Sequence, residues 1–290
     1  MELIDMLKIE YWHLGIIEFK NSDKSLEEIL KNNRIQWLKY KYKDRFFADP
    51  FLFNATDNVY NILAEEYLHD ERKGKIVLLE VDKRKKNIRN RKIFLEEKTH
   101  LSFPFLYNGK LYVENYRSNN YYNYQLKDMS ITGKKLEFNQ PCIDPIIYNH
   151  CGVEYLFTSL PDNPFGYERL FYKENGHWIE HPKSPIESNK KYSRMAGNIF
   201  MNEERLIRPV QDCKNSYGNQ LHFMQITKLT KDEFEEKKIL SLSTQNESKY
   251  NMGIHTFNMY DNFILVDGYS YRVHPIRRII TTLKRRGLKR

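Results

Sequence analysis

The sequence repeats one short pattern five times, and this repetition limits the fold more than any other feature. In each copy an apolar run is followed by a polar turn and a second apolar run. The copies begin near Phe46, Phe103, Asp144, Ala196 and Gly253. Each copy predicts two short antiparallel strands joined by a turn. The prolines of the first three copies, Pro50, Pro104 and Pro145, are 54 and 41 residues apart. A period of roughly 40–50 residues is typical of the blades of a β-propeller.

Five such units fit in 290 residues, so we predict an all-β fold that is a single five-bladed β-propeller. The 21 tyrosines and 17 phenylalanines suit strands. The alternative is a β-sandwich whose hairpins resemble one another by chance. A polar or charged residue recurs at the same place in the first strand of each unit, and this recurrence favours the propeller.

The segments on either side of the repeats complete the predicted domain organisation. We expect residues 1–45 to pack on the propeller, residues 46–270 to form it, and residues 271–290 to form a basic amphipathic tail. The strand predicted at residues 10–17 would close the ring with the last unit. Ser25 and Glu28 form a capping-box pattern that predicts a helix from Ser25 to Lys39. Residues 230–250 are polar and charged, which predicts a surface excursion.

The net charge of +9 is concentrated at the end of the chain. Eight basic residues and no acidic residue follow Gly268, so the preceding part of the chain carries only about +1. Pro275 suits the first turn of a helix. The tail places Ile276, Ile279, Ile280 and Leu283 on one helical face. A helix with one apolar face and a basic opposite face suits binding to an anionic membrane surface. The alternative is a helix packed on the propeller with its charged face in water. Nucleic acid is an unlikely partner, because the body offers no second basic stripe interleaved with aromatic residues.

Several protein classes lack support in the sequence. There is no apolar run near 18 residues that would span a membrane, and Met1–Glu10 lacks the apolar core of a signal peptide. The three cysteines are scattered and odd in number, which predicts reduced thiols in the cytosol. No metal-ligand or nucleotide-binding motif is found, so we predict no metal and no cofactor. We expect a cytoplasmic protein, peripheral on the inner membrane face.

The propeller prediction also gives the position of a site. The first strand of each blade lines the central channel, so the side chains at the start of these strands converge at one end of it. These residues are Asp49, His100, Ser102, Asp144, Arg194 and His255. The ends of the second strands add Glu65, Glu114, Arg208, Gln211, Asp212 and Asp267. Carboxylates are seldom buried without partners, so a ring of them favours a functional site.

Some of these residues have structural explanations as well. Asp49 and Asp144 suit turns ahead of the prolines that follow them. His255 suits a packed core, and Arg194 suits an ion pair with a nearby carboxylate. We treat Asp49, Asp144, Glu114 and Glu65 as the candidate catalytic residues and the other eight as candidate substrate or phosphate ligands.

Two families share motifs with this chain. Ala48-Asp49-Pro50-Phe51 and Ile143-Asp144-Pro145 resemble five-bladed propeller enzymes that act on furanosides, such as arabinanases and invertases. A closer resemblance, from Trp12 to Gly268, is to the amino-terminal domain of plant glucosamine inositolphosphorylceramide transferase and its bacterial relatives. The matching elements are Ala48–Phe51, His100–Phe105, Tyr112–Glu114, Arg208–Asp212, Tyr217-Gly218, Gly253–Thr256 and Asp267-Gly268. This resemblance implies a role in cell-surface polysaccharide synthesis.

The chain departs from the furanoside hydrolases at the fourth blade. Those enzymes carry a general-acid glutamate there, whereas Ser193–Gly197 contains Arg194 and no acid. A phosphate leaving group needs no acid, and a guanidinium can neutralise it. The resemblance then implies that Asp49 acts as general base on an acceptor hydroxyl and Asp144 stabilises an oxocarbenium-like centre.

Three functions follow, and the sequence leaves all three open. The first is a glycosyltransferase that moves a furanosyl sugar from a phosphorylated donor, with a lipid-linked glycan as a possible acceptor. The second is a furanosidase-like hydrolase with Glu65 or Glu114 as its acid. The third is a glycan-binding propeller without catalysis, for which we would expect a shallow rim without paired carboxylates.

Overall fold

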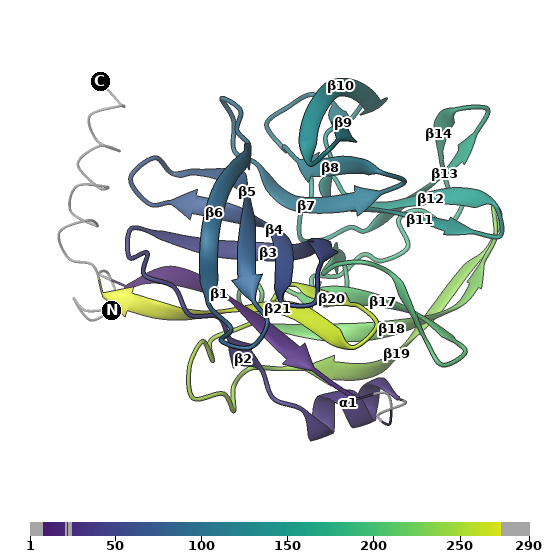
Figure 1. Cartoon of the computed structure of the whole chain (residues 1–290). Coiled ribbons are helices and arrows are strands. Elements are labelled where there is room, and N and C mark those ends of the chain that lie inside the picture. The colour runs from purple at the N-terminus through teal and green to yellow at the C-terminus, as the bar shows by residue number, and fades with distance from the viewer. Residues whose placement is uncertain (1–7, 21, 23–24, 274–290) are drawn as a thin grey trace.

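The computed structural model describes residues 8–20, 22 and 25–273 and contains five antiparallel sheets. The sheets are the blades of a five-bladed β-propeller, and the one helix in this part of the chain lies at its edge (Figure 1). The all-β, five-bladed prediction is confirmed. Among the described residues, no helix is long and apolar enough to cross a membrane.

The first three blades are meanders of four strands in chain order, with the first strand innermost. Blade 1 contains β3 (Arg45–Ala55), β4 (Val59–Leu68), β5 (Lys73–Asp82) and β6 (Ile88–Leu95). Blade 2 contains β7 (Ser102–Tyr107), β8 (Lys110–Glu114), β9 (Tyr121–Lys127) and β10 (Ser130–Phe138). Blade 3 contains β11 (Ile143–His150), β12 (Val153–Ser159), β13 (Arg169–Glu174) and β14 (His177–Glu180).

The fourth and fifth blades vary this plan. In blade 4 the inner strand is split in two, and the strands are β15 (Arg194–Met195), β16 (Phe200–Asn202), β17 (Arg205–Asp212), β18 (Gln220–Leu229) and β19 (Phe234–Leu242). Blade 5 combines both ends of the described chain, with β20 (Phe257–Met259), β21 (Phe263–Val273), β1 (Lys8–Glu18) and β2 (Gln36–Trp37).

The pairing of β1 with β21 closes the ring. The two strands are in register along their whole length, from Lys8 opposite Val273 to Glu18 opposite Phe263. The N-terminal strand is therefore the third strand of blade 5. Strand β21 runs to Val273, so residues 271–273 belong to a blade. The expected amphipathic helix after Pro275 lies outside the described residues.

Two local predictions need correction. The capping box at Ser25 and Glu28 is present, but α1 (Leu26–Asn32) ends seven residues before Lys39. It ends there because Asn33 takes an extended conformation and binds the carbonyl of Ile29, and the chain then pairs with β1 as β2. The expected surface excursion at residues 230–250 contains β19, the outer strand of blade 4. Its mixed polar pattern suits an edge strand, which needs charge to discourage further pairing.

The inner strands of blades 1 to 3 share a bulge at the residue that precedes the proline. Asp49, Phe103 and Asp144 all have left-handed φ values of 50°, 48° and 45°. The strand register shifts at each of these positions. Proline has no N–H to donate, so the ladder of hydrogen bonds is interrupted there. A bulge re-aims the side chain beside it, and here it also leaves the N–H of the bulged residue outside the ladder.

Carboxylates accept the N–H groups of these bulged residues and join neighbouring blades. Asp267 of blade 5 accepts from Asp49 of blade 1 at 3.0 Å. Asp49 in turn accepts from Phe103 of blade 2 at 3.1 Å. Glu114 of blade 2 accepts from Asp144 of blade 3 at 2.8 Å. The repeated proline therefore specifies the contact between blades as well as the strand.

Blade 4 meets blade 5 through a glycine. Gly197 has φ 142°, and a Cβ at this position would lie 2.2 Å from the carbonyl oxygen of Phe257. The adjacent N–H of Phe257 donates to the carbonyl of Ala196 at 2.6 Å. This close backbone approach requires a residue without a side chain.

We predict that Gly197→Ala destabilises the protein by roughly 2–5 kcal/mol, because left-handed strain of about 1–2 kcal/mol adds to overpacking of about 1–3 kcal/mol. Gly152→Ala is the matched control, because Gly152 also has a positive φ of 83° but a Cβ added there would have no atom within 4 Å. Urea unfolding measures both. Equal losses for the two variants would contradict the close approach of blades 4 and 5.

Candidate active site

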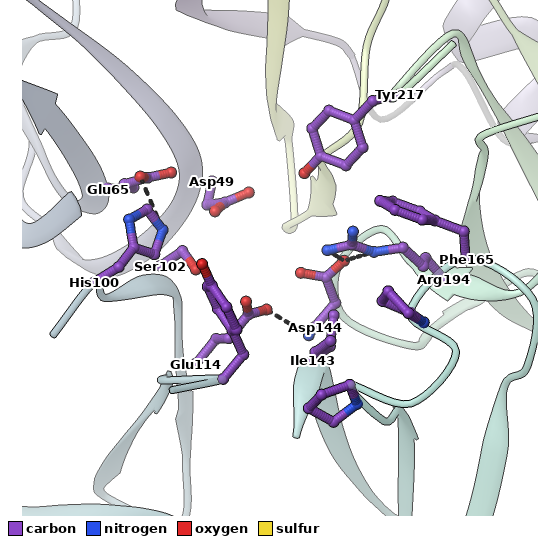
Figure 2. Close-up of a pocket in the computed structure, with 13 residues that line it drawn as sticks. Asp49, Glu65, His100, Ser102, Glu114, Ile143, Asp144, Phe165, Arg194 and Tyr217 are labelled. Atoms are coloured by element: carbon purple, nitrogen blue, oxygen red, sulfur yellow. Dashed lines mark hydrogen bonds and ion pairs between the residues drawn. The ribbon is translucent and has the colours of Figure 1, made fainter. Parts of the chain in front are cut away.

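A pocket of about 420 Å³ opens at one end of the channel. Figure 2 shows its lining from blades 1 to 4 together with the loops that follow β12 and β17. The lining residues are Asp49, Glu65, His100, Ser102, Glu114, Tyr116, Ile143, Asp144, Pro161, Pro164, Phe165, Arg194 and Tyr217. Four of them are carboxylates that are only 4–7 % exposed. Such a concentration of buried acids in one cavity is uncommon without a functional reason.

The position of each carboxylate follows from the blade plan. Asp49 and Asp144 occupy the bulges of the inner strands β3 and β11. Glu65 lies near the end of β4, opposite Ala48 in the strand register, and Glu114 ends β8, opposite Ser102. The start of an inner strand and the end of its neighbour meet at the same end of a blade, so all four acids reach one cavity.

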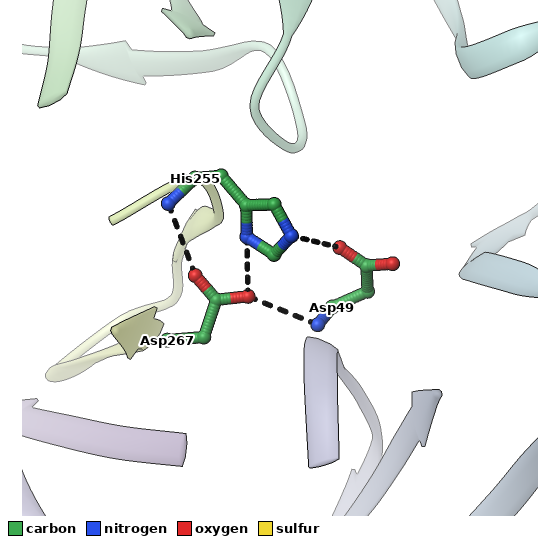
Figure 3. A group of neighbouring side chains, drawn as sticks. All are labelled: Asp49, His255 and Asp267. Carbon is green, nitrogen blue, oxygen red and sulfur yellow. Dashed lines mark hydrogen bonds and ion pairs between the residues drawn. The ribbon is translucent and has the colours of Figure 1, made fainter. Parts of the chain in front are cut away.

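Asp49, His255 and Asp267 form a buried acid–histidine–acid group, shown in Figure 3. His255 lies between the two aspartates, with Nδ1 2.7 Å from Asp267 and Nε2 3.6 Å from Asp49. Asp267 also accepts the backbone N–H groups of His255 and Thr256 at 3.1 and 2.9 Å. The Thr256 hydroxyl donates to Asp49 at 3.0 Å. The imidazole ring stacks on Trp12 at 3.8 Å, which fixes its plane.

This arrangement sets the charge of the group. Burial lowers the pKa of His255, but Asp267 and then Asp49 outweigh it, and the net pKa is raised. Burial raises the pKa of Asp49 to about 6, against the attraction of His255. A carboxylate with this pKa is ionised at neutral pH and is a stronger base than an ordinary aspartate. That is the property a general base needs.

Asp144 is held differently, by an ion pair. Its Oδ2 accepts from Nε of Arg194 at 2.7 Å and lies 2.6 Å from Nη2. Gln211 donates to the same oxygen at 2.8 Å. The guanidinium lies against the rings of Phe165 and Tyr217, 5.2 Å from each centroid. The other oxygen of Asp144 points into the pocket (Figure 2).

The pKa values of the two glutamates are also raised. Burial, and then the neighbouring carboxylates, hold the pKa of Glu65 well above its ordinary value. Burial and Asp144 do the same for the pKa of Glu114. Desolvation and like charge both disfavour the ionised form, so both side chains hold a proton more strongly than an ordinary glutamate. The pocket therefore combines an ion-paired aspartate, Asp144, with two glutamates whose pKa values are raised.

His100 faces Glu65 in a defined tautomer. The N–H of Gly74 donates to its Nδ1 at 2.9 Å, so the proton of the neutral ring is on Nε2. Nε2 lies 3.4 Å from Oε1 of Glu65. This Oε1 atom makes no hydrogen bond to a described residue. Burial lowers the pKa of His100 to about 4, so the ring is neutral at physiological pH. His100 is thus a polar neighbour of Glu65 and carries no charge to bind an anion.

The twelve residues predicted from sequence divide into three groups. Seven line the pocket, namely Asp49, Glu65, His100, Ser102, Glu114, Asp144 and Arg194. Three lie behind its wall and hold lining residues in place, namely Gln211, His255 and Asp267. The last two lie elsewhere. Arg208 is fully buried and donates to Glu236, and Asp212 accepts from Gln220 and His222.

Those two positions are explained by their place in β17. Arg208 and Asp212 share a strand with Gln211, but a strand of blade 4 turns alternate residues to opposite faces. Arg208 faces the outer strand β19, whose Glu236 neutralises it together with the more distant Glu168. Neither residue can contact a ligand in this pocket.

The apolar walls of the pocket were not predicted. Pro161, Pro164 and Phe165 come from the loop between β12 and β13, Tyr116 from the loop after β8, and Tyr217 from the loop after β17. Phe165 and Tyr217 contact each other edge to face at 6.1 Å. The proline-rich run from Leu160 to Gly166 marks a rigid loop, which was the available signal in the sequence.

One group among the described residues has the composition of a metal site. Ligand atoms of Asp49, His255 and Asp267 all lie within 4.8 Å of one another. Some of these atoms take part in hydrogen bonds, since Nδ1 of His255 donates to Asp267 and the Thr256 hydroxyl donates to Asp49, whereas Nε2 of His255 lies 3.6 Å from Asp49. Asp267 and Asp49 raise the pKa of His255, so a metal bound here would have to displace the proton of the imidazole.

Comparison with known proteins gives a consistent family. The profile of glucosamine inositolphosphorylceramide transferase 1, N-terminal, matches residues 35–260. The curated protein of that name from Oryza sativa subsp. japonica is 29% identical over 210 residues, 67% of this chain. The one from Arabidopsis thaliana is 29% identical over 225 residues, 70% of this chain. Each match covers 28% of the relative, so the chain corresponds to little more than a quarter of their length.

A solved structure has the same fold. The catalytic domain of the Coprinopsis cinerea GH62 alpha-L-arabinofuranosidase superposes with a TM-score of 0.54 at 8% identity. The match covers 77% of this chain and 90% of that domain. At this identity the likeness concerns the propeller fold alone.

We predict that Glu114→Gln makes the protein more stable at high pH but not at low pH. The unfolded chain ionises Glu114 near its ordinary value of 4.5, whereas the folded pocket resists ionisation. The wild type therefore loses stability as the pH rises from 4.5 toward the raised pKa, and glutamine, which stays neutral, avoids this loss. Melting temperatures from pH 4 to 9 measure it, with a gain of about 2–4 °C for each kcal/mol. The exposed Glu204→Gln is the control, and a constant difference across this range would contradict a buried, protonated Glu114.

Proposed function

Because this chain belongs to the family of glucosamine inositolphosphorylceramide transferase 1 N-terminal domains, we propose that it is a carbohydrate-active enzyme that transfers a glycosyl group. The observation that carries the proposal is the separation of two aspartates in one pocket into different environments. Asp49 is poised as a base beside His255, and Asp144 is fixed as an anion by Arg194. Glycosyl transfer needs both functions on opposite sides of a sugar ring.

Asp49 removes the proton of the attacking hydroxyl in this proposal. Its pKa of about 6 matches a base that works near neutral pH. The Phe103 N–H and the Thr256 hydroxyl fix the orientation of its carboxylate. His255 stays protonated beside it and stabilises the ionised form. Asp267 is a positioning residue, because it binds the imidazole and the N–H of Asp49 and does not line the pocket.

Asp144 stabilises the positive charge that develops on the sugar. Arg194 and Gln211 bind one of its oxygens, and the other points into the cavity (Figure 2). Prior fixation of the carboxylate means that little reorganisation is needed when the oxocarbenium-like centre forms. Phe165 and Tyr217 provide an apolar wall for a sugar ring, and the hydroxyl of Tyr217 points into the pocket.

The finer part of the proposal is a phosphorylated furanosyl donor used in cell-surface polysaccharide assembly. A phosphate needs a cation, and Arg194 is the one lysine or arginine among the described lining residues. His100 cannot supply this charge, because its lowered pKa keeps it neutral. The furanosyl sugar and the polysaccharide pathway rest on the family resemblance. We place the donor phosphate next to Arg194 and the acceptor hydroxyl next to Asp49.

Hydrolysis of a glycoside is the second candidate function, and the glutamates favour it. The entry of blade 4 contains no acid, but Glu65 and Glu114 both lie in the pocket with raised pKa values. Either can protonate a leaving oxygen, which is the acid function that a glycosidase requires. The same four buried carboxylates count against the non-catalytic glycan-binding alternative, for which we expected no paired acids.

We predict that Asp49→Asn lowers turnover by roughly 10²–10⁴-fold and leaves ligand binding nearly unchanged, because asparagine keeps the shape but cannot accept a proton. The substrate is first identified by thermal shift with sugar nucleotides, sugar phosphates and neutral furanosides, since a ligand of the native state raises the melting temperature. The wild-type kcat/KM should also fall below about pH 6 as Asp49 is protonated.

Asp82→Asn is the matched control for this experiment. Asp82 is a buried aspartate that accepts backbone N–H groups, as Asp49 does, but it lies at the tip of the hairpin between β5 and β6. This variant should keep full activity. Normal turnover by Asp49→Asn would refute the assignment of the base.

We predict that Glu65→Gln and Glu114→Gln separate transfer from hydrolysis. A phosphate leaves without protonation, so with a phosphorylated donor both variants should keep most of their activity. An alkyl glycoside needs an acid, so a hydrolase should lose roughly 10²–10⁴-fold in one of the two variants. That loss should disappear with a 4-nitrophenyl leaving group. Measuring kcat/KM with the three kinds of substrate decides between the two functions.

A further inference from the structure

A second surface of the protein collects positive charge on the edge of blade 5. The segment Lys39-Tyr40-Lys41-Tyr42-Lys43 alternates exposed lysines with half-buried tyrosines. A groove of about 510 Å³ brings these lysines together with two distant residues, Lys249 and Arg272. We call the five cations Lys39, Lys41, Lys43, Lys249 and Arg272 the basic face. The expectation that the body lacks a basic stripe with interleaved aromatic residues is therefore wrong.

The basic face has no compensating acid. No aspartate or glutamate is among the described residues that line the groove, and none of its five cations forms an ion pair with a described residue. Elsewhere on the surface lysines such as Lys73, Lys134 and Lys231 do pair with glutamates. The effect on the interior is visible at His13 beneath the groove. Burial lowers its pKa to about 4, and Arg272 and Lys249 contribute in the same direction.

The rings of this face are already engaged. His13 is stacked between Tyr40 at 4.4 Å and Tyr250 at 4.1 Å. Tyr40 and Tyr42 both pack edge to face on Phe47, and the Tyr11 ring carries the guanidinium of Arg272. Single-stranded nucleic acid binds by stacking bases on free aromatic faces, and these faces are not free. What the surface offers instead is a row of point charges on long, flexible stems.

We propose that the basic face docks on the anionic headgroups of a lipid bilayer. Exposed lysines suit this partner, because a charged membrane surface attracts them without fixed geometry. The sequence beyond Val273 continues with Arg277, Arg278, Lys284 and further basic residues, interleaved with isoleucines and leucines. Arg272, near the end of β21, is part of the face, so in the sequence the basic run begins at this surface.

The face and the pocket are linked through packed rings. Trp12 contacts Tyr217 of the pocket wall at 5.9 Å and Tyr269 of β21 at 4.6 Å. Tyr40, which lines the groove, donates its hydroxyl to the carbonyl of Trp12 at 3.5 Å. Docking through the basic face would therefore hold the pocket near the bilayer. This inference does not depend on which reaction the pocket performs.

The test is co-sedimentation of the full chain with vesicles of phosphatidylcholine alone or with about 30% phosphatidylserine, a fraction that gives the surface an anionic potential. The wild type should bind the anionic vesicles, and less so at high salt. The triple variant Lys39→Gln, Lys41→Gln, Lys43→Gln should bind at least about tenfold more weakly, given a contribution on the order of fivefold for each lysine. All three lysines are exposed, so the melting temperature should not change.

The matched control removes the same charge elsewhere. Lys127, Lys135 and Lys237 are exposed on blades 2 and 4, away from the groove, and their triple glutamine variant should bind as the wild type does. A second variant, Arg285→Gln with Arg286→Gln, tests the segment after Val273. Loss of binding in this variant alone, with the basic-face variant unaffected, would overturn the proposal. Equal binding to neutral vesicles, or binding only to a single-stranded oligonucleotide, would overturn it as well.

Discussion

The architecture depends on one kind of hydrogen bond, in which a carboxylate of one blade accepts the backbone N–H of a bulged residue in the next. Asp267, Asp49 and Glu114 make this bond at three successive junctions. Such a hydrogen bond contributes about 0.5–1.5 kcal/mol to a neutral acid and about 1.5–3 kcal/mol to an ionised one, comparable to the roughly 1–2 kcal/mol that a left-handed non-glycine residue costs. The proline after each bulge leaves the N–H outside the ladder, and the acid satisfies it. Removing either element would leave a buried polar group without a partner.

The same requirement creates the electrostatics of the pocket. Joining blades by acids places several carboxylates at one end of a narrow channel, where burial and then the neighbouring carboxylates raise the pKa values of Asp49, Glu65 and Glu114. His255 and Arg194 neutralise two of them, and the glutamates respond by holding protons. Glu65 differs from the other acids. Glu114 accepts the N–H of the bulged residue in the next blade, but the corresponding N–H for Glu65, that of Phe103, donates to Asp49 instead. It is left with an oxygen that no described residue binds, facing His100. Because Glu65 makes no such hydrogen bond between blades, its carboxyl group is available for proton transfer.

Site residues could be predicted from the sequence where their structural role recurs from blade to blade, and could not be predicted where that role occurs once. Asp49 and Asp144 were identifiable because each precedes a proline in a recurring unit, and their convergence followed from the propeller plan. Arg208 and Asp212 were misplaced because alternation along β17 turns them away from Gln211, and the sequence did not show that Glu236 on a distant outer strand would pair with Arg208. Phe165 and Tyr217 come from loops outside the repeat, so no periodicity marked them. Because a helix was expected to run as far as Lys39, the common face of Lys39, Lys41 and Lys43 was not predicted. Helix α1 ends at Asn32, and the groove brings the three lysines together.

Charge is divided between two surfaces, and the net value of +9 conceals the division. The pocket holds four acids and one arginine, whereas the groove on blade 5 holds five cations and no acid among its described residues. An anionic ligand attracted by the overall charge would therefore meet the groove more favourably than the pocket. A neutral sugar ring would enter the pocket without this electrostatic cost, and Arg194 is the one lysine or arginine among the described lining residues. If the pocket binds a sugar and the groove an anionic headgroup, as proposed, a molecule that carries both groups can use both surfaces at once.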